Sequence, residues 1–209
     1  ISMLFGNFNT VFGNDLKKAI EAYNRDDFKT AISYLKPLAE KGDMYGQYNL
    51  GVMYDRGRGV PQDYKLAFKW FTKAAEQGYA SAQFNLGSMY NQGDGVPQDD
   101  KMAFKWYAKA AEQGYVNAQL NLGDMYRDGV GVPNDDKMAF KWYTKAAEQG
   151  YADAQFELGE MYGLGRGVPQ DYIKAHMWSN VYLQNNALIL RVVAKNNIKK
   201  FEKQMTLEQ

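Results

Sequence analysis

The sequence predicts an all-α protein, a right-handed solenoid in which pairs of helices stack along the chain. Within its 209 residues, the segments QYNLGVMY, QFNLGSMY, QLNLGDMY and QFELGEMY recur every 36 residues from Gln47. Gly-x-Gly-Val-Pro follows each of them, and KAAEQGY closes the first three units. A fixed period of this length is typical of stacked supersecondary units that cannot bury their apolar faces alone.

The first half of each unit reads as a helix, near residues 44–56 in the first copy. The three-and-four spacing places Gln47, Leu50 and Tyr54 on one stripe together with Gly51. A glycine inside a helix costs about 1 kcal/mol relative to alanine. It nevertheless recurs at Gly51, Gly87, Gly123 and Gly159. We therefore expect a neighbouring helix to approach closely at this position.

The second half of each unit reads as another helix, which begins after the Gly-x-Gly-Val-Pro breaker. Two residues after each proline comes an aspartate suited to an N-cap: Asp63, Asp99, Asp135 and Asp171. In the first copy, alanines and aromatic residues follow until Gly78, which is placed as a helix-ending glycine. Because small alanines alternate with large aromatic rings, we expect the side chains of this helix to interdigitate with those of adjacent helices.

The two ends of the chain differ from the middle, as a solenoid requires. A shortened helix pair without the breaker is expected at the start, and one long capping helix over 186–204 at the end. The lysines of that last helix give it a polar outer side. The predicted organisation is a segment 1–14, a helix pair 15–43, four repeats (44–79, 80–115, 116–151 and 152–185) and a cap with tail 186–209. This makes eleven helices and no sheet.

Composition excludes several classes of function. The 25 basic and 24 acidic residues nearly cancel, which argues against a dedicated nucleic-acid binder or a polybasic membrane surface. Cysteine is absent and His176 is the single histidine, so thiolate chemistry and most histidine-based catalysis or metal binding are excluded. No apolar run is long enough for a membrane helix. The start at Ile1 suggests a removed signal peptide or a tag remnant, and we expect a periplasmic or secreted protein.

The repeated pattern resembles the Sel1-like repeat family. The string A-x-x-x-L-G-x-x-Y-x-x-G-x-G-V-P-x-D-x-x-K-A-x-x-W-x-x-K-A-A-E-Q-G follows this family's consensus, and residues 82–114 carry one copy. The opening helix pair is similar to the related tetratricopeptide unit, and MTLEQ at 205–209 is similar to a tail motif of bacterial members. The resemblance implies a non-catalytic adaptor that binds another protein. It leaves two alternatives: an immunity protein that neutralises a secreted antibacterial effector such as a phospholipase, and, more remotely, a cell-wall or β-lactam-related enzyme. The cysteine-rich members are a poor match.

A binding face is suggested by comparing the repeats with one another. Repeats 80–115 and 116–151 differ at nine positions, and six of these fall in the first helix. At about 100° per residue, all six lie opposite the packing stripe. Because first helices line the concave surface of such solenoids, variation there predicts the face that holds a partner helix or extended peptide.

The predicted partner-binding residues form columns along the stacked first helices. An apolar column (Tyr48, Phe84, Leu120, Phe156) runs beside Val52, Ser88, Asp124 and Glu160, then Asp55, Asn91 and Arg127, with Asn49, Asn85 and Asn121 flanking them. Acidic residues gather toward the end of the array, which favours a basic or amine-bearing segment. The alternative is a solvated face whose aromatic rings contact the next repeat. The asparagines either hold the backbone of a partner or bond to a neighbouring first helix.

Other constellations have structural interpretations. His176 and Ser179 could form a nucleophile–base pair, but His176 occupies an aromatic packing position of the other repeats. The Gly-x-Gly turns lack the preceding strand of a nucleotide-binding loop. Acidic pairs such as Asp99-Asp100 fit helix capping and lack the ligand pattern of a calcium loop. We therefore expect no catalysis, cofactor or metal, and we assign no oligomeric state.

Overall fold

The computed structural model describes residues 13–185, 198–199 and 202, and this part of the chain contains ten α-helices and no strand. The helices are α1 (Gly13–Asn24), α2 (Phe28–Glu40), α3 (Met44–Arg56), α4 (Tyr64–Glu76), α5 (Ala80–Gln92), α6 (Asp100–Glu112), α7 (Val116–Asp128), α8 (Asp136–Glu148), α9 (Ala152–Leu164) and α10 (Tyr172–Asn185). From α3 onward, first and second helices each recur every 36 residues, which confirms the predicted all-helical repeat fold. The predicted capping helix over 186–204 lies outside the described residues, apart from Ile198, Lys199 and Glu202.

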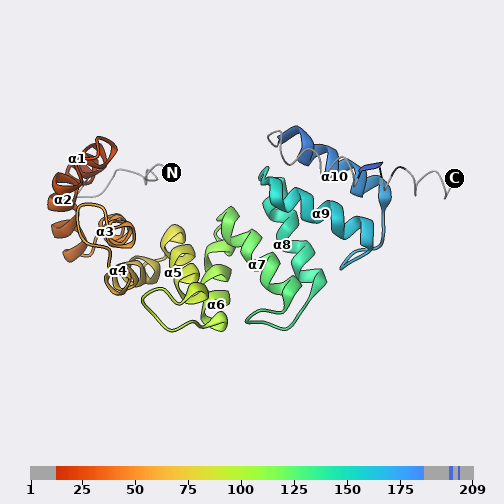
Figure 1. The fold of residues 1–209 in the computed structure, drawn as a ribbon, viewed down its shortest axis with the longest axis horizontal. Helices are drawn as coiled ribbons and strands as arrows, with labels where there is room; N and C mark the ends of the chain where they lie inside the picture. The colour runs from red at the N-terminus through yellow and green to blue at the C-terminus, as the bar shows by residue number, and fades with distance from the viewer. Residues whose placement is uncertain (1–12, 186–197, 200–201, 203–209) are drawn as a thin grey trace. The chain divides into compact units, whose positions relative to one another are not determined.

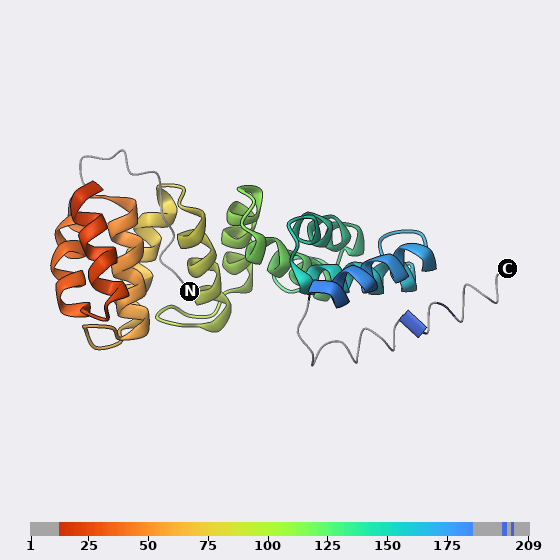
Figure 2. The same ribbon diagram turned by 90° about the horizontal axis from the view of Figure 1, so that it is seen from above.

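Two compact units make up the chain, Ile1–Ala110 and Ala111–Gln209. In unit 1, consecutive helices from α1 to α5 pack against each other, and Figure 2 shows them side by side. In unit 2, α7 to α10 do the same (Figure 1). Each unit has its own apolar core, one part of which surrounds Leu35 and Met53 in unit 1 and another Tyr143 and Leu158 in unit 2. Within each unit, helix pairs therefore stack as a solenoid.

The recurring glycine of the first helix is the point where the two helices of a repeat come closest. A Cβ added at Gly51, Gly87 or Gly123 would lie only 2.6–2.8 Å from an aromatic ring on the second helix. Those rings belong to Phe71, Tyr107 and Tyr143, respectively. The expected close approach is thus confirmed, and its cause is a large ring that fills the space of a missing side chain.

Local capping explains where the second helices begin. The carboxylates of Asp63, Asp99, Asp135 and Asp171 each accept a hydrogen bond from the backbone N–H three residues later, at 2.9–3.0 Å. This confirms the predicted N-caps, and it accounts for the acidic pairs without a bound ion.

The second glycine of the Gly-x-Gly turn has a packing role. A Cβ at Gly59 would collide with Phe28, at the start of the preceding second helix.

Buried glutamines join each repeat to the helix before it. Gln47, Gln83, Gln119 and Gln155 are at most 4% exposed, and their Nε2 atoms donate to backbone carbonyls on the preceding second helix at 3.1–3.2 Å. The acceptors are Ala39, Ala75, Ala111 and Ala147. Because a buried amide without a partner is costly, this glutamine ladder fixes the register between successive repeats.

Candidate interaction face of the first helices

The rings of the predicted apolar column pack against aromatic rings on the second helices. The Tyr48 ring lies 5.8 Å from that of Phe71 and 5.0 Å from that of Tyr79, at the entrance to the next repeat. Similar ring contacts join Phe84 to Tyr107 at 5.5 Å and Phe156 to Tyr182 at 5.3 Å. Leu120 packs against the apolar core of unit 2. These side chains are half-buried, so they contribute to the fold and still present an edge to solvent.

In the column that contains Val52 and Asp124, the side chain on the first helix varies with the residue that it contacts on the second helix of the same repeat. Val52 is 8% exposed and packs in one apolar cluster with Phe71, which has no hydroxyl group. At the equivalent positions of the third repeat, the hydroxyl of Tyr143 donates to Asp124 Oδ1 at 2.7 Å. The first-helix side chain is thus matched to its partner on the second helix, and part of its variation has an internal cause.

The flanking asparagines do not behave alike. Asn49 is 3% exposed, and its Nδ2 donates to the Tyr45 carbonyl of its own helix at 2.8 Å. Its Oδ1 is buried and has no hydrogen-bond partner among the described residues. Asn85 and Asn121 are half-buried. At Asn49, the predicted bond to a neighbouring first helix is replaced by a bond within α3.

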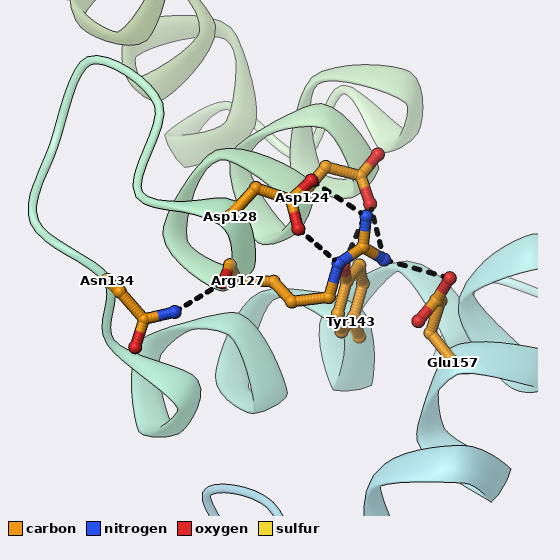
Figure 3. Close-up of polar contacts among 6 residues, drawn as sticks. All are labelled: Asp124, Arg127, Asp128, Asn134, Tyr143 and Glu157. Atoms are coloured by element: carbon orange, nitrogen blue, oxygen red, sulfur yellow. Dashed lines mark hydrogen bonds and ion pairs between the residues drawn. The ribbon is translucent and has the colours of Figure 1, made fainter.

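In unit 2, several polar contacts of the first helices converge on Arg127 (Figure 3). Its Nε and Nη2 atoms form a bidentate pair with Asp128, at 2.8 and 3.0 Å. Its Nη1 lies 3.2 Å from Asp124 on the same helix and 2.9 Å from Glu157 on α9. We call these four residues the Arg127 cluster. It links the first helices of two adjacent repeats through one guanidinium group, which is suited to bidentate carboxylate contacts.

The three carboxylates of the Arg127 cluster differ in the direction in which their pKa values are shifted. Burial raises the pKa of Asp124 and that of Glu157, against the opposing effects of hydrogen bonds and of the Arg127 charge. The hydrogen bond from Arg127 lowers the pKa of Asp128. With three carboxylates and one guanidinium, the cluster carries a formal charge of −2 at neutral pH. It is therefore an acidic site in which two carboxylates are only partly hydrated.

Unit 1 presents a different surface at the equivalent positions. Burial raises the pKa of Asp55, and the nearby Asp94 adds to this effect. Asn91 is exposed, whereas Ser88 is half-buried and accepts a hydrogen bond from Gln92 Nε2 at 2.9 Å. The two units thus differ in the chemistry that they offer a partner.

The Arg127 cluster combines predicted and unpredicted residues. Asp124 and Arg127 are among the predicted binding residues, and Glu157 is one of the acidic residues that the sequence places toward the end of the array, whereas Asp128 and Tyr143 were not predicted. Repeat comparison gives a signal for Glu157, because the other three copies have asparagine there. Glu160 is half-buried on α9 beyond the cluster. The structure therefore brings Asp124, Arg127 and Glu157 together, and it adds Asp128 and Tyr143, which no signal in the sequence indicates.

The possible nucleophile–base pair does not form. His176 is 3.2 Å from Glu202 and 3.1 Å from the Asn180 amide, measured from its ring nitrogens. Ser179 is 4% exposed and faces Gly159 on α9. Among the residues described, no group of three potential ligands could hold a metal ion, and no helix has the length and hydropathy to cross a membrane.

Comparison with known proteins agrees with this architecture. A family model described as the Sel1 repeat matches residues 45–79, 80–115, 116–151 and 152–180. A search of curated proteins finds no match.

Solved structures give the same result. A Sel1 repeat protein from Oxalobacter formigenes is 35% identical, covering 81% of this chain and 70% of its own, with a TM-score of 0.78. The protective antigen c5321 of uropathogenic Escherichia coli, described as having an SLR fold, is also 35% identical, with a TM-score of 0.87. It covers 93% of this chain, which spans only 42% of that protein. The immunity protein Pa5087 of Pseudomonas aeruginosa, at 23% identity over 87% of this chain and 68% of its own, shares the fold alone, with a TM-score of 0.54.

Proposed function

Because the chain belongs to the Sel1 repeat family, whose members generally mediate protein–protein interaction, we propose that it is a non-catalytic adaptor that binds a basic segment of a partner protein. The binding surface is the exposed side of the first helices, and its most selective part is the Arg127 cluster in unit 2. In the same unit, the half-buried side chains of Leu120 and Phe156 offer apolar contact area for the partner.

The observation that carries this proposal is that the repeat fold does not require the Arg127 cluster. The positions of Asp124, Arg127 and Glu157 hold Val52, Asp55 and Asn49 in the first repeat, and Ser88, Asn91 and Asn85 in the second. The helices at these places nevertheless have the same bounds relative to the repeat. Apart from the match of Asp124 to Tyr143, these residues vary while the fold stays constant, which leaves them free to specialise in recognition.

The chemistry of the cluster supports a cationic partner group. Its excess of two negative charges attracts lysine or arginine, and partial burial strengthens that attraction relative to a fully hydrated site. The Tyr143 ring is fully buried beneath the cluster, with its centre 6.0 Å from the Arg127 guanidinium carbon, so an incoming cation meets the partly exposed carboxylates.

The test is affinity capture from soluble and envelope fractions of the organism that encodes the chain. Wild type is compared with the isosteric double variant Asp124→Asn/Glu157→Gln, which removes two negative charges and keeps the side-chain shapes. A matched control, Asp136→Asn/Glu148→Gln, makes the same charge change on the second helix α8. We avoid substituting Phe84 or Phe156 because their rings pack against tyrosines and alanine would disturb the fold.

The expected result is a protein captured by wild type and by the control, and lost with the cluster variant. Its release by salt would follow the screening of exposed charges. Equal capture by all three proteins would place the binding surface elsewhere, and capture of no protein from either fraction would remove the adaptor function. The fraction that yields the partner also tests the predicted periplasmic or secreted location.

A further inference from the structure

The outward side of the second helices carries a repeated row of lysines. They stand at intervals of four residues: Lys65, Lys69 and Lys73 on α4, Lys101, Lys105 and Lys109 on α6, and Lys137, Lys141 and Lys145 on α8. All nine are exposed, and none of them forms an ion pair within the described part of the chain. The last lysine of each row lies over a tryptophan ring, at 4.4–5.0 Å. Three second helices thus have the same cationic outer surface.

The last described second helix breaks this rule at every position of the row. On α10 the equivalent residues are Ile173, Met177 and Val181, which we call the α10 stripe. Ile173 is 73% exposed and Met177 is 46% exposed. Together with Leu164, they make up three of the five large hydrophobic residues that are exposed in the described structure. Apolar residues therefore gather where the rest of the chain places charge.

Among the described residues, the ionisable side chains of α10 beside the stripe have partners. The helix packs against α9 on its other side. Beside the stripe, Lys174 pairs with Asp171 at 3.4 Å, and His176 contacts Glu202. No unpaired charge of α10 therefore projects into the stripe, and a second apolar surface can approach it without desolvating an ion.

We propose that the α10 stripe is the contact surface between two copies of this chain, related by a two-fold axis. Its three members are equally spaced about Met177 and span about 12 Å along the helix. In an antiparallel pair of α10 helices, Met177 meets its own counterpart, and Ile173 of each copy faces Val181 of the other. A two-fold contact needs such a self-complementary pattern. Methionine at the centre suits it, because its flexible side chain adapts to a facing copy.

The lysine rows explain why this contact is restricted to α10. Two copies that met through α4, α6 or α8 would bring like charges face to face, which is unfavourable. Replacing three lysines by Ile173, Met177 and Val181 removes that repulsion at one helix only. The charge pattern therefore disfavours contacts between two copies through α4, α6 or α8 and leaves α10 as the second helix through which they can meet.

The first test is the molar mass in solution as a function of concentration, by light scattering and sedimentation equilibrium. Wild type is expected to dimerise with a Kd in the range of about 1–100 μM, as befits a small interface. The variant Ile173→Lys/Met177→Lys/Val181→Lys restores the residues of the other repeats and is expected to weaken dimerisation about 100-fold. Because Ile173 and Met177 are exposed and Val181 is only half-buried, the helical circular dichroism signal should be retained. A wild-type protein that stays monomeric to 500 μM, or a dimer unaffected by the three lysines, would overturn the proposal.

A second test fixes the geometry and uses the absence of cysteine from the chain. Under mild oxidation, Met177→Cys should form a disulfide-linked dimer, because this residue lies at the two-fold axis. Lys69→Cys and Lys141→Cys place the same thiol at the equivalent position of other repeats and serve as matched controls. Selective cross-linking at residue 177 supports the proposal, whereas equal or absent cross-linking at all three positions contradicts it.

Discussion

At the scale of single residues, the contact between glycine and an aromatic ring governs the fit of the two helices in a repeat. Gly123 illustrates it, because an added Cβ would lie 2.6 Å from the Tyr143 ring. In the fourth repeat, the ring is replaced by Ser179, and a Cβ at Gly159 would lie 3.1 Å from the serine hydroxyl oxygen. The same sequence position is thus under different steric demands in two repeats.

We expect Gly123→Ala to lower the free energy of unfolding by about 1–2 kcal/mol, as overpacking outweighs a gain of about 1 kcal/mol in helix propensity. Gly159→Ala should change it by less than about 0.5 kcal/mol, because the hydroxyl that it meets is small. Urea denaturation of both variants measures the difference. Equal destabilisation at the two sites would show that the ring contact does not control this position.

The carboxylates of the Arg127 cluster predict opposite pH effects on stability. Burial raises the pKa of Asp124 above its ordinary value of 3.8 in the folded protein, so the folded state holds this proton more tightly than the unfolded state. Its contribution to stability is complete below the ordinary pKa and is lost as the pH rises through the raised value. For Asp128, whose pKa is lowered by the bond from Arg127, the contribution is complete above the ordinary pKa and is lost as the pH falls.

The free energy of unfolding of Asp124→Asn, relative to that of wild type, should therefore be higher at pH 7 than at pH 3.5. The expected difference is about 0.5 kcal/mol after allowance for partial exposure. Asp128→Asn should show the reverse trend. Chemical denaturation at the two pH values provides the comparison. The same sign for both variants would contradict the burial that we assign to Asp124.

At the scale of elements, the glutamine ladder holds successive helices in register. Gln119 donates to the Ala111 carbonyl, and its own carbonyl accepts a bond of 2.7 Å from Gln149. Both bonds are lost if Gln119 is replaced by leucine, which has a similar size. The Ala111 carbonyl then keeps only the bond that it accepts from the Gly114 N–H at 3.0 Å, and the Gln149 amide loses its 2.7 Å bond to Gln119.

Gln119→Leu is expected to destabilise unit 2 by about 1–3 kcal/mol, and its effect should overlap with that of Gln149→Ala. A double-mutant cycle from urea denaturation quantifies the coupling. Strict additivity of the two single effects would indicate that the glutamines act independently.

The elements themselves could be predicted from the sequence because their signals are local. Each aspartate N-cap and each helix-ending glycine determines a helix boundary within a few residues. Because of the 36-residue period, the same boundary signals recur in the four repeats. The candidate site was less predictable. The pairing of Tyr143 with Asp124, 19 residues apart, and of Arg127 with Glu157, 30 residues apart, depends on how helices pack. Repeat variation predicts a binding face, and the structure shows that part of this variation compensates for a residue inside the same repeat.

At the scale of the whole molecule, stability is expected to be local, because each helix packs mainly against its neighbours in sequence. A lesion such as Gly123→Ala should therefore weaken unit 2 and leave unit 1 largely unchanged. Hydrogen exchange is the direct measurement: amides of α7 and α8 should lose protection by about tenfold or more, while those of α2 and α3 keep theirs. Uniform loss throughout the chain would mean that the two units unfold as one.

The direction of the contacts between repeats has a consequence for biosynthesis. Each ladder glutamine bonds to a carbonyl that precedes it in the chain, and Gly59 packs against the earlier Phe28. During translation, every repeat that leaves the ribosome therefore finds its acceptor groups already synthesised and folded. Since domains form from the N-terminal end as the chain emerges, the nascent protein can extend one repeat at a time on a finished template. The polarity of the ladder thus coincides with the order in which the ribosome delivers the residues.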